Sequence, residues 1–311
     1  MDVVETAAAC GALLDAARAT GATVGLVPTM GALHAGHVSL VERARAECDV
    51  VAVSIFVNPL QFGDPEDMEK YPRTLERDLD VCREAGVDVV FVPPVSEMYP
   101  SWPAPPATTV SVLGVSERWE GAARPGHFDG VATVVAKLFS IAGACRAYFG
   151  LKDFQQLAVV RRMVLDLLQP VEIVGCPIVR EADGLALSSR NVRLSADERR
   201  AATALARALD AARGAVVAGE RSGPALAGVM RATVATEPLV ELDYAVAVDA
   251  ATLDALDTVT DPGAVRFLVA ALVGPVRLID NGAALAAADD PAPLVPIPTA
   301  TAEVRNLERI G

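Results

Sequence analysis

The feature that most constrains the fold is an alternation of short β-branched runs with longer helical patterns over residues 23–174. The runs predict strands at residues 23–28, 50–57, 87–92, 146–149 and 171–174. The segments between them predict helices at residues 36–47, 74–85, 131–142 and 154–168. Such alternation is typical of βαβ units, because parallel strands need a crossover connection. The predicted fold class is α/β, with a Rossmann-like parallel sheet.

The pattern changes after this region. A Pro-rich stretch at residues 93–106 leads to residues 108–113, predicted as an added strand or a wall of the cleft. Beyond Pro177 we expect a polar hinge, helices at residues 196–218 and 224–236, and strands at residues 242–248, 265–273 and 276–279. The predicted domains are therefore 1–178, a smaller α+β unit over 179–288, and a Pro-rich tail over 289–311 with one turn at 302–309.

The charge balance limits the partners of the chain. Asp and Glu number 40 against 27 Lys and Arg, which gives a net charge of −13. An acidic surface repels the phosphates of nucleic acids and anionic membranes, so we expect neither as a partner. A small anionic substrate is still possible, because a few placed cations can reverse the sign within one cleft. The best apolar run, residues 131–145, is too short to span a bilayer and contains Lys137.

The cysteines and the N-terminal residues indicate the compartment. The five cysteines are odd in number and form no CxxC pair, and they are Cys10, Cys48, Cys82, Cys145 and Cys176. They predict buried thiols in a reducing cytosol. Asp2 and Glu5 stand where a signal peptide would carry basic residues. We therefore expect a cytoplasmic protein.

The strongest local signal is PTMGALHAGH, residues 28–37, which leaves the first predicted strand and enters the first predicted helix. It holds two of the three histidines of the chain, His34 and His37. Free amides and the helix dipole at this end favour negative charge, and Gly31 and Gly36 would let a flat ligand approach the backbone. The alternative is a tight turn with two surface histidines. The glycines favour an anion site.

A second junction between a strand and a helix is FGLKDFQQ, residues 149–156. Lys152 offers a mobile charge suited to phosphate, and Asp153 could cap the helix or hold a ribose hydroxyl. The glutamines offer amides for hydroxyl or carboxylate recognition. Taken alone, the segment is better explained as an ordinary helix cap.

A third cluster, GLALSSRN, occupies residues 184–191 just after the predicted hinge. Two hydroxyls, their backbone amides and the Arg190 guanidinium could form an anion clamp. A capped loop explains the segment equally well. Its position is informative, because a clamp on the second domain could close over a nucleotide held by the first.

Two more segments suggest cleft lining. In FVNPLQF, residues 56–62, a strand ends in polar amides between aromatic rings, which suits a small polar ligand, although Pro59 could simply end the strand. In RPGHFDG, residues 124–130, a structured helix entrance is favoured over Arg124 reaching the site.

Together these motifs resemble the pantothenate synthetase (pantoate–β-alanine ligase) family of the HxGH nucleotidyltransferase superfamily. The similarity runs from Val27 to about Leu194, and the shared motifs, in family order, are PTMGALHAGH, FVNPLQF, YPRTLERDL, RPGHFDGV, KDFQQ and LALSSRN. HxGH alone would be unspecific, since other nucleotidyltransferases and class I tRNA synthetases share it. The resemblance implies a catalytic N-terminal domain, a C-terminal lid and a homodimer.

The resemblance also implies the reaction. The pantoate carboxylate attacks the α-phosphorus of ATP, giving pantoyl adenylate and pyrophosphate, and the β-alanine amine then displaces AMP. The catalytic residues would be His34, His37, Lys152 and Arg190, with His37 as proton donor and Mg²⁺ assisting. The implied ATP-binding positions are Met30, Gly31, Ala32, Leu33, His34, Ala35, Gly36, His37, Gly150, Leu151, Lys152, Asp153, Val179, Leu187, Ser188, Ser189 and Arg190. Gln61 and Gln156 would hold pantoate, with Gln61 also near β-alanine; the metal ligands stay unassigned.

Two positions depart from the family pattern. Leu151 replaces an acid common before the lysine of the KDFQQ motif, and Arg77 replaces an acid beside Asp78. No base for the β-alanine amine is evident in the motifs. Two rival functions are another HxGH adenylyl- or cytidylyltransferase, and a nucleotide-binding regulator that has lost turnover. The paired glutamines argue against the first, and intact His37, Lys152 and Arg190 argue against the second.

Overall fold

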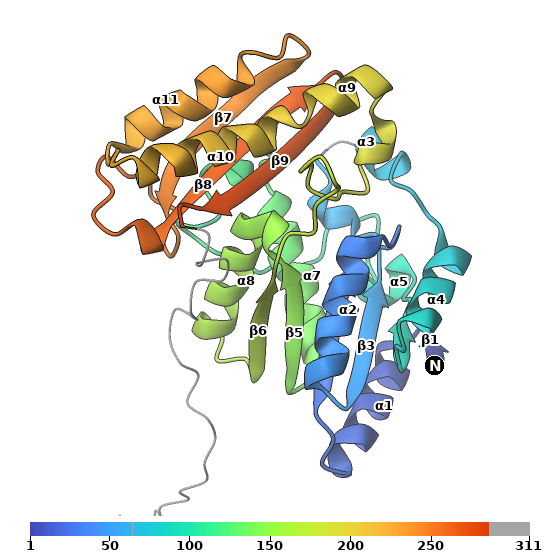
Figure 1. The fold of residues 1–311 in the computed structure, drawn as a ribbon. Coiled ribbons are helices and arrows are strands. Elements are labelled where there is room, and N and C mark those ends of the chain that lie inside the picture. Colours follow the sequence, from blue (N-terminus) through green and yellow to red (C-terminus); the bar gives the residue numbers. More distant parts are fainter. Residues whose placement is uncertain (64, 286–311) are drawn as a thin grey trace, which may run out of the picture.

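The computed structural model describes residues 1–63 and 65–285. Its larger part is a six-stranded, all-parallel sheet in the order β1-β4-β3-β2-β5-β6 (Figure 1). The strands are β1 (Asp2–Val4), β2 (Val24–Thr29), β3 (Val50–Ile55), β4 (Val89–Phe91), β5 (Cys145–Gly150) and β6 (Val171–Cys176). This confirms the predicted Rossmann-like class.

Helices cover both faces of this sheet, because alternate strand residues are apolar on each side. Leu26 and Ala147 face a core shared with α1 (Ala7–Ala19), α7 (His127–Ala142) and α8 (Phe154–Asp166). Val27 and Tyr148 face a second core under α2 (Ala35–Glu47) and α4 (Leu75–Glu84). Short connecting elements complete this part: the 3₁₀ turns η1 (Pro59–Gln61) and η2 (Leu151–Asp153), and the helices α3 (Pro65–Glu69), α5 (Val95–Met98) and α6 (Glu120–Ala123).

The smaller part is an antiparallel sheet in the order β7-β8-β9, seen at the top of Figure 1. The elements are η3 (Asn191–Arg193), α9 (Ala196–Ala201), α10 (Ala204–Val217), α11 (Gly223–Val234), β7 (Val240–Asp249), η4 (Pro262–Ala264), β8 (Val265–Val273) and β9 (Val276–Ala283). One face of the sheet packs on α10 and α11, with Phe267 fully buried between them. The other face contributes Val248 and Leu268 to the core of the larger part. The two parts therefore share one apolar interface.

Most predicted elements are confirmed to within a few residues, but some details are wrong or were missed. Residues 108–113 form no strand; they run along α7, where the Val110 amide donates to the Thr133 hydroxyl at 2.9 Å. The predicted helix 196–218 is broken after α9, where the Thr203 hydroxyl donates to the Arg200 carbonyl at 2.7 Å. β1 and α1 were not predicted, and β9 extends four residues beyond the predicted strand.

The remaining predictions concern the cysteines, membrane-spanning segments and the tail. All five cysteines are free and buried, as predicted. Over the described ranges, no helix combines the length and the apolar character that crossing a membrane requires. The predicted tail 289–311 and its turn lie outside the described residues.

The strand order fixes where a ligand can bind. From the central strand β2 the chain passes to β3 and β4 on one side, and later returns to β5 and β6 on the other. In open parallel sheets, the point where the order reverses leaves a crevice beyond the carboxyl ends of the two strands. Here that crevice lies between the ends of β2 and β5, and the HxGH and KDFQQ segments follow these two strands.

Candidate active site

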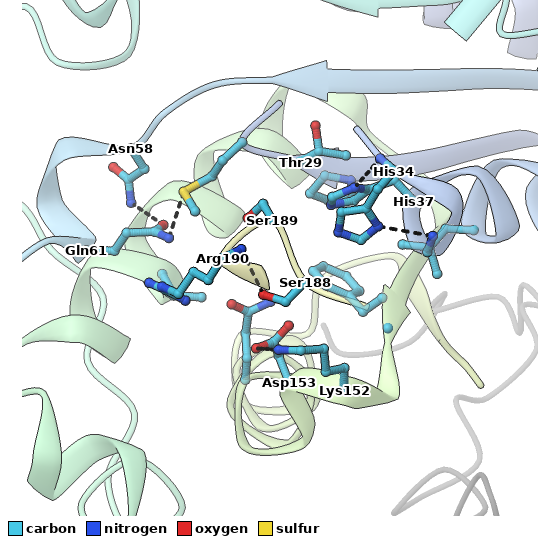
Figure 2. A pocket seen from close by; sticks show the side chains of 18 of the residues that line it. Thr29, His34, His37, Asn58, Gln61, Lys152, Asp153, Ser188, Ser189 and Arg190 are labelled. Carbon is cyan, nitrogen blue, oxygen red and sulfur yellow. Dashed lines mark hydrogen bonds and ion pairs between the residues drawn. The ribbon is translucent and has the colours of Figure 1, made fainter. Parts of the chain in front are cut away.

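A cavity of about 230 Å³ opens at this crevice. The predicted site residues that line it are Met30, His34, Gly36, His37, Gln61, Gly150, Lys152, Asp153, Gln156, Val179, Leu187, Ser188, Ser189 and Arg190. Figure 2 shows Asn58 and Gln61 on one side of the Ser188–Arg190 loop, and His34 and His37 on the other. The fold thus brings four separate sequence motifs to one cavity.

The other predicted positions lie beside the cavity lining. Gly31, Ala32 and Leu33 form the loop before α2, and Ala35 is the first residue of that helix. Leu151, the departure from the family pattern, is 1% exposed within the larger core. None of these five residues is part of the cavity lining.

His34 and His37 cap the N-terminus of α2 reciprocally. His34 Nδ1 accepts from the Gly36 amide at 3.1 Å, and His37 Nδ1 accepts from the His34 amide at 3.3 Å. A neutral imidazole that accepts at Nδ1 carries its proton at Nε2. Both rings, whose centroids are 4.2 Å apart, therefore keep an Nε2–H donor for a ligand.

Burial keeps these two histidines neutral in the free protein. Burial, followed by the neighbouring His34, lowers the pKa of His37 to about 3. Burial also lowers the pKa of His34, with the positive charge of Lys152 acting in the same direction. A bound polyphosphate would oppose this shift, because negative charge favours imidazolium.

Two features hold the loop that carries His34. Gly36 allows the His34 ring to lie close to the backbone at the start of α2, since a Cβ there would lie 2.9 Å from Cε1 of that ring. The Asp78 carboxylate, 1% exposed, accepts from the amides of Ala32 at 2.9 Å and Leu33 at 2.8 Å. Ala32 has a positive φ of 51°, a strained conformation that these bonds stabilise. Asp78 thus supports the histidine loop, while Arg77 is exposed on α4.

Buried amides form the wall around η1. Asn58 Nδ2 donates to Gln61 Oε1 at 3.1 Å and to the Gly130 carbonyl at 3.0 Å, and Tyr99 donates to Asn58 Oδ1 at 2.8 Å. Gln61 is 8% exposed, and its Nε2 lies 2.9 Å from the sulfur of Met30. The side-chain amide of Gln61 is therefore held in one orientation before any ligand binds.

The third histidine also lines this cavity. His127 Nδ1 lies 2.9 Å from the Gln61 carbonyl, and Arg124 reaches the same carbonyl at 3.3 Å. The predicted structural role of this segment agrees with these contacts, but Arg124 and His127 face the ligand space too. The signal available in the sequence was that His127 is the only histidine outside the HxGH motif.

The KDFQQ segment divides its residues between two tasks. Lys152 and Gln156 line the cavity, and Lys152 Nζ lies 3.8 Å from Asp153 Oδ1. Asp153 precedes α8 but makes no capping hydrogen bond through its side chain, so of the two roles considered for it the capping role is wrong. Gln155 is 4% exposed and binds the backbone of Val115, Arg118 and Glu120, which makes it structural.

The Ser188–Arg190 loop follows a small hairpin in which Arg180 and Ala186 pair. Ser188 Oγ accepts from the Arg190 amide at 3.2 Å, and the Ser189 hydroxyl bonds with that of Tyr71. Tyr71 lies in the YPRTLERDL motif and was not predicted as a site residue. This loop completes a wall with three permanent cations, Lys152, Arg124 and Arg190, and one carboxylate, Asp153, among the described lining residues.

The comparisons with known proteins agree with this geometry. The family model described as pantoate-beta-alanine ligase matches residues 2–283. A pantothenate synthetase from Roseiflexus sp. (strain RS-1) is 56% identical over 269 residues, covering 86% of this chain and 95% of the relative. One from Rubrobacter xylanophilus is 56% identical over 270 residues, covering 86% of this chain and 92% of the relative.

Solved structures give the same result. The crystal structure of pantothenate synthetase from Thermus thermophilus matches with a TM-score of 0.85 at 49% identity, covering 91% of this chain and 99% of that one. Pantoate-beta-alanine ligase from Francisella tularensis, complexed with beta-gamma ATP and beta-alanine, matches with a TM-score of 0.73 at 32% identity, covering 91% and 98%. Sequence, fold and site geometry agree, and the chain belongs to the pantoate–β-alanine ligase family.

Proposed function

We propose that the cavity at the ends of β2 and β5 is where this chain joins pantoate to β-alanine at the expense of ATP. The observation that carries the proposal is the gathering of His34, His37, Lys152 and Arg190 around one cavity in a chain of net charge −13. Lys152 and Arg190 are basic, and local cations concentrate anionic substrates against the field of the whole molecule, while the neutral histidines offer Nε2–H donors. ATP and pantoate are both anionic, and a related ligase has been solved with an ATP ligand and β-alanine.

The reaction proceeds through two displacements. A pantoate carboxylate oxygen bonds to the α-phosphorus of ATP, and the bond from that phosphorus to the β-phosphate oxygen breaks, releasing pyrophosphate. The β-alanine nitrogen then bonds to the acyl carbon, the carbon–oxygen bond to AMP breaks, and the nitrogen loses a proton. Both reactants of the first step are negative, so its catalysis depends on positioning and on neutralisation of charge.

Lys152, Ser188, Ser189 and Arg190 are assigned to the departing pyrophosphate. Lys152 comes from the turn η2 after β5, and the other three come from the loop that follows the Arg180–Ala186 hairpin, so the two groups approach the cavity from different parts of the chain. A cation and hydroxyl donors on both sides of a leaving phosphate stabilise the charge that develops as the bond breaks.

His34 and His37 are assigned to the phosphates, with His37 as proton donor. Their Nδ1 atoms are occupied by backbone amides, which leaves Nε2–H as the group available to a phosphate oxygen. Both are neutral donors in the free protein, because burial lowers their pKa values. Bound phosphate raises those values, so proton donation belongs to the ATP complex.

The remaining assignments follow the cavity wall. Met30, Gly150, Asp153 and Val179 are assigned to adenosine, with the backbone of residues 31–36, Leu151 and Leu187 alongside. Gln61 and Gln156 are assigned to the hydroxyls and carboxylate of pantoate, with Gln61 also near β-alanine. The fixed Gln61 amide supports this, because an immobilised donor loses little entropy on binding.

Mg²⁺ is assigned to the substrate rather than to a protein site. Within residues 1–63 and 65–285, no cluster of three or more His, Cys, Asp or Glu side chains could hold a metal ion. Mg²⁺ typically binds substrate phosphates with one or two carboxylates and several waters. We expect it to enter bound to ATP. Asp153 is the carboxylate of the cavity wall that is available to bind it.

Three broader assignments accompany the site. The chain is divided into a catalytic domain over residues 1–178, a lid over 179–288 and a tail over 289–311. Five free, buried thiols suit a reducing compartment, which supports a cytoplasmic location. The family resemblance supports a homodimer, which sedimentation velocity would test.

Analysis of the products tests the reaction. Incubation with ATP, pantoate and β-alanine should yield AMP, pyrophosphate and pantothenate, and exchange of pyrophosphate into ATP should require pantoate. ADP as the product would exclude an adenylate. A nucleotidyl product that β-alanine does not consume would support the rival adenylyl- or cytidylyltransferase. Lys152→Ala should reduce the exchange by at least about 100-fold, the scale of one electrostatic contribution, and unchanged exchange would remove its assigned role.

A further inference from the structure

Asn281, on the edge strand β9, binds the turn that carries Lys152. It is 3% exposed, and its Nδ2 donates to the carbonyls of Leu151 at 3.0 Å and Lys152 at 2.7 Å. Its Oδ1 accepts from Nε of Arg266 at 2.8 Å. Both ends of the amide are satisfied, so the side chain has one orientation. The C-terminal sheet therefore holds the backbone of a proposed catalytic residue directly.

Arg266, on the neighbouring strand β8, reinforces this contact. It is 2% exposed, and its guanidinium carbon lies 4.4 Å from the centroid of the Phe154 ring. Phe154 is the first residue of α8 and directly follows the Lys152 turn. The start of α8 and the turn before it are thus fixed by two side chains of the C-terminal sheet.

Asp280, the residue before Asn281, binds a second wall of the cavity, the one that carries Ser188–Arg190. Its two carboxylate oxygens accept from Arg180 at 2.7 and 2.9 Å, and Arg180 also donates to the Gly184 carbonyl at 2.9 Å. Arg180 and Gly184 belong to the hairpin that leads into Ser188–Arg190. Adjacent strand residues project to opposite faces, so one strand can reach both walls.

We propose that Asn281 is a positioning residue for adenylation: together with Asp280, it sets the distance between the Lys152 turn and the Ser188–Arg190 loop. The C-terminal sheet then forms part of the phosphate site as well as covering it. The inference rests on the proposed role of Lys152. A strand is a rigid spacer, and Asn281 and Asp280 are both 3% exposed with hydrogen-bonded side chains, so the spacing is set before ATP binds.

Asn281→Asp tests this with almost no change of shape. The variant keeps an oxygen for Arg266 but places a second oxygen against the carbonyls of Leu151 and Lys152, which repels the turn. We expect pantoate-dependent pyrophosphate exchange to fall by about 10- to 100-fold, the cost of a misplacement near 1 Å. Aminolysis of preformed pantoyl adenylate by β-alanine should stay at the wild-type rate, because no pyrophosphate is present in that step.

Asp254→Ala is the matched control. Asp254 pairs with Arg118 across the same two parts of the chain; both side chains are about half exposed, and neither residue lines the cavity. Both half-reactions should stay normal in this variant. An equal loss in both half-reactions of Asn281→Asp would indicate general damage and overturn the positioning role.

A double-mutant cycle separates this inference from the proposed function. If Asn281 acts through Lys152, Asn281→Asp should lower exchange little further in a Lys152→Ala background. Normal exchange in Lys152→Ala alone would remove the role proposed for that lysine. Loss in Lys152→Ala with normal exchange in Asn281→Asp would overturn only the inference about Asn281.

Asn281→Ser provides a second variant if the aspartate is poorly tolerated. Its hydroxyl is too short to reach both carbonyls, and it adds no charge. It should show the same selective loss of adenylation with a cooperative thermal unfolding transition. If both variants fail to fold at the assay temperature, Asn281 is a determinant of folding, and the positioning proposal is wrong.

Discussion

At the scale of single residues, the two histidines of the HxGH motif combine two tasks in one ring. Nδ1 caps a helix and Nε2 is left for the ligand, so the capping bonds select the tautomer that the chemistry needs. The motif predicted donors at this place from the sequence. The reciprocal capping was not predicted, because it depends on the extended backbone of His34, with φ of −140° and ψ of 176°.

His34→Asn and His37→Asn should separate these two tasks. The side-chain oxygen of asparagine can accept the backbone amide in place of Nδ1, and asparagine is a favoured capping residue. Neither variant retains a donor at the position of Nε2. We expect thermal unfolding close to that of the wild type, with pantoate-dependent pyrophosphate exchange reduced by about 100-fold or more.

His37→Ala serves as the comparison, since it removes one of the two reciprocal capping bonds, the one from the His34 amide to His37 Nδ1, together with the donor. It should lose the same activity and also about 1 kcal/mol of stability, the usual contribution of a helix cap. Wild-type exchange in either asparagine variant would show that Nε2 does not contact the reacting phosphates.

At the scale of elements, the wall that holds Asn58 and Gln61 depends on how closely α7 packs on η1. The contact is made at Gly130, where a Cβ would lie 2.4 Å from the Leu60 carbonyl oxygen. The carbonyl of Gly130 also accepts from Asn58, which in turn holds Gln61. The position of Gln61 is therefore set by a helix that is distant in the sequence.

Gly130→Ala should push η1 away from α7. We expect a loss of about 1–3 kcal/mol in unfolding free energy, the cost of overpacking, together with a raised KM for pantoate. Gly214→Ala, in the interior of α10, is the control, because nothing lies within 4 Å of the added Cβ. It should stabilise the protein by about 0.5–1 kcal/mol without changing either kinetic constant.

Urea unfolding and steady-state kinetics of the two variants would check this. Equal stabilities, or an unchanged KM for pantoate in Gly130→Ala, would mean that η1 can shift without displacing Gln61.

A comparison of predicted and observed strands indicates which parts of the fold the sequence could predict. Strands buried on both faces, such as β2 and β3, are continuous apolar runs, and their bounds were predicted to within two residues. β1 was missed because three residues at a sheet edge carry little pattern. β9 was cut short because Asp280 and Asn281 interrupt the apolar run, although both are 3% exposed. Their burial depends on Arg180 and on the Lys152 turn, which only the tertiary structure brings near.

At the scale of the whole molecule, the acidic residues and the histidines occupy different places. The surface carries the excess of acids, while all three histidines line one cavity. The site residues could be predicted because motifs are local, but their shared burial could not, because it follows from how two sheets pack. That burial makes the stability of the folded chain depend on pH.

His127 is suited to measure this dependence. Its Nε2 lies 3.4 Å from Nη1 of Arg124, which can only donate, so the imidazole must accept there and carries its proton at Nδ1. Burial, followed by the charge of Arg124, lowers its pKa from 6.5 to about 4. Between these values the unfolded chain binds a proton at this residue that the folded chain does not. The contribution to stability is therefore complete above pH 6.5 and is lost as the pH falls towards 4.

His127→Gln should remove this proton uptake, while a glutamine amide can still donate to the Gln61 carbonyl. Between about pH 6 and pH 4.5, the unfolding free energy of the wild type should fall more steeply than that of the variant, by about 1.4 kcal/mol per pH unit. Urea unfolding at several pH values would measure both slopes, and the carboxylates common to the two proteins cancel in the difference. Parallel slopes would mean that His127 titrates normally in the folded chain. The burial of His127 in the cavity would then impose no cost in acid.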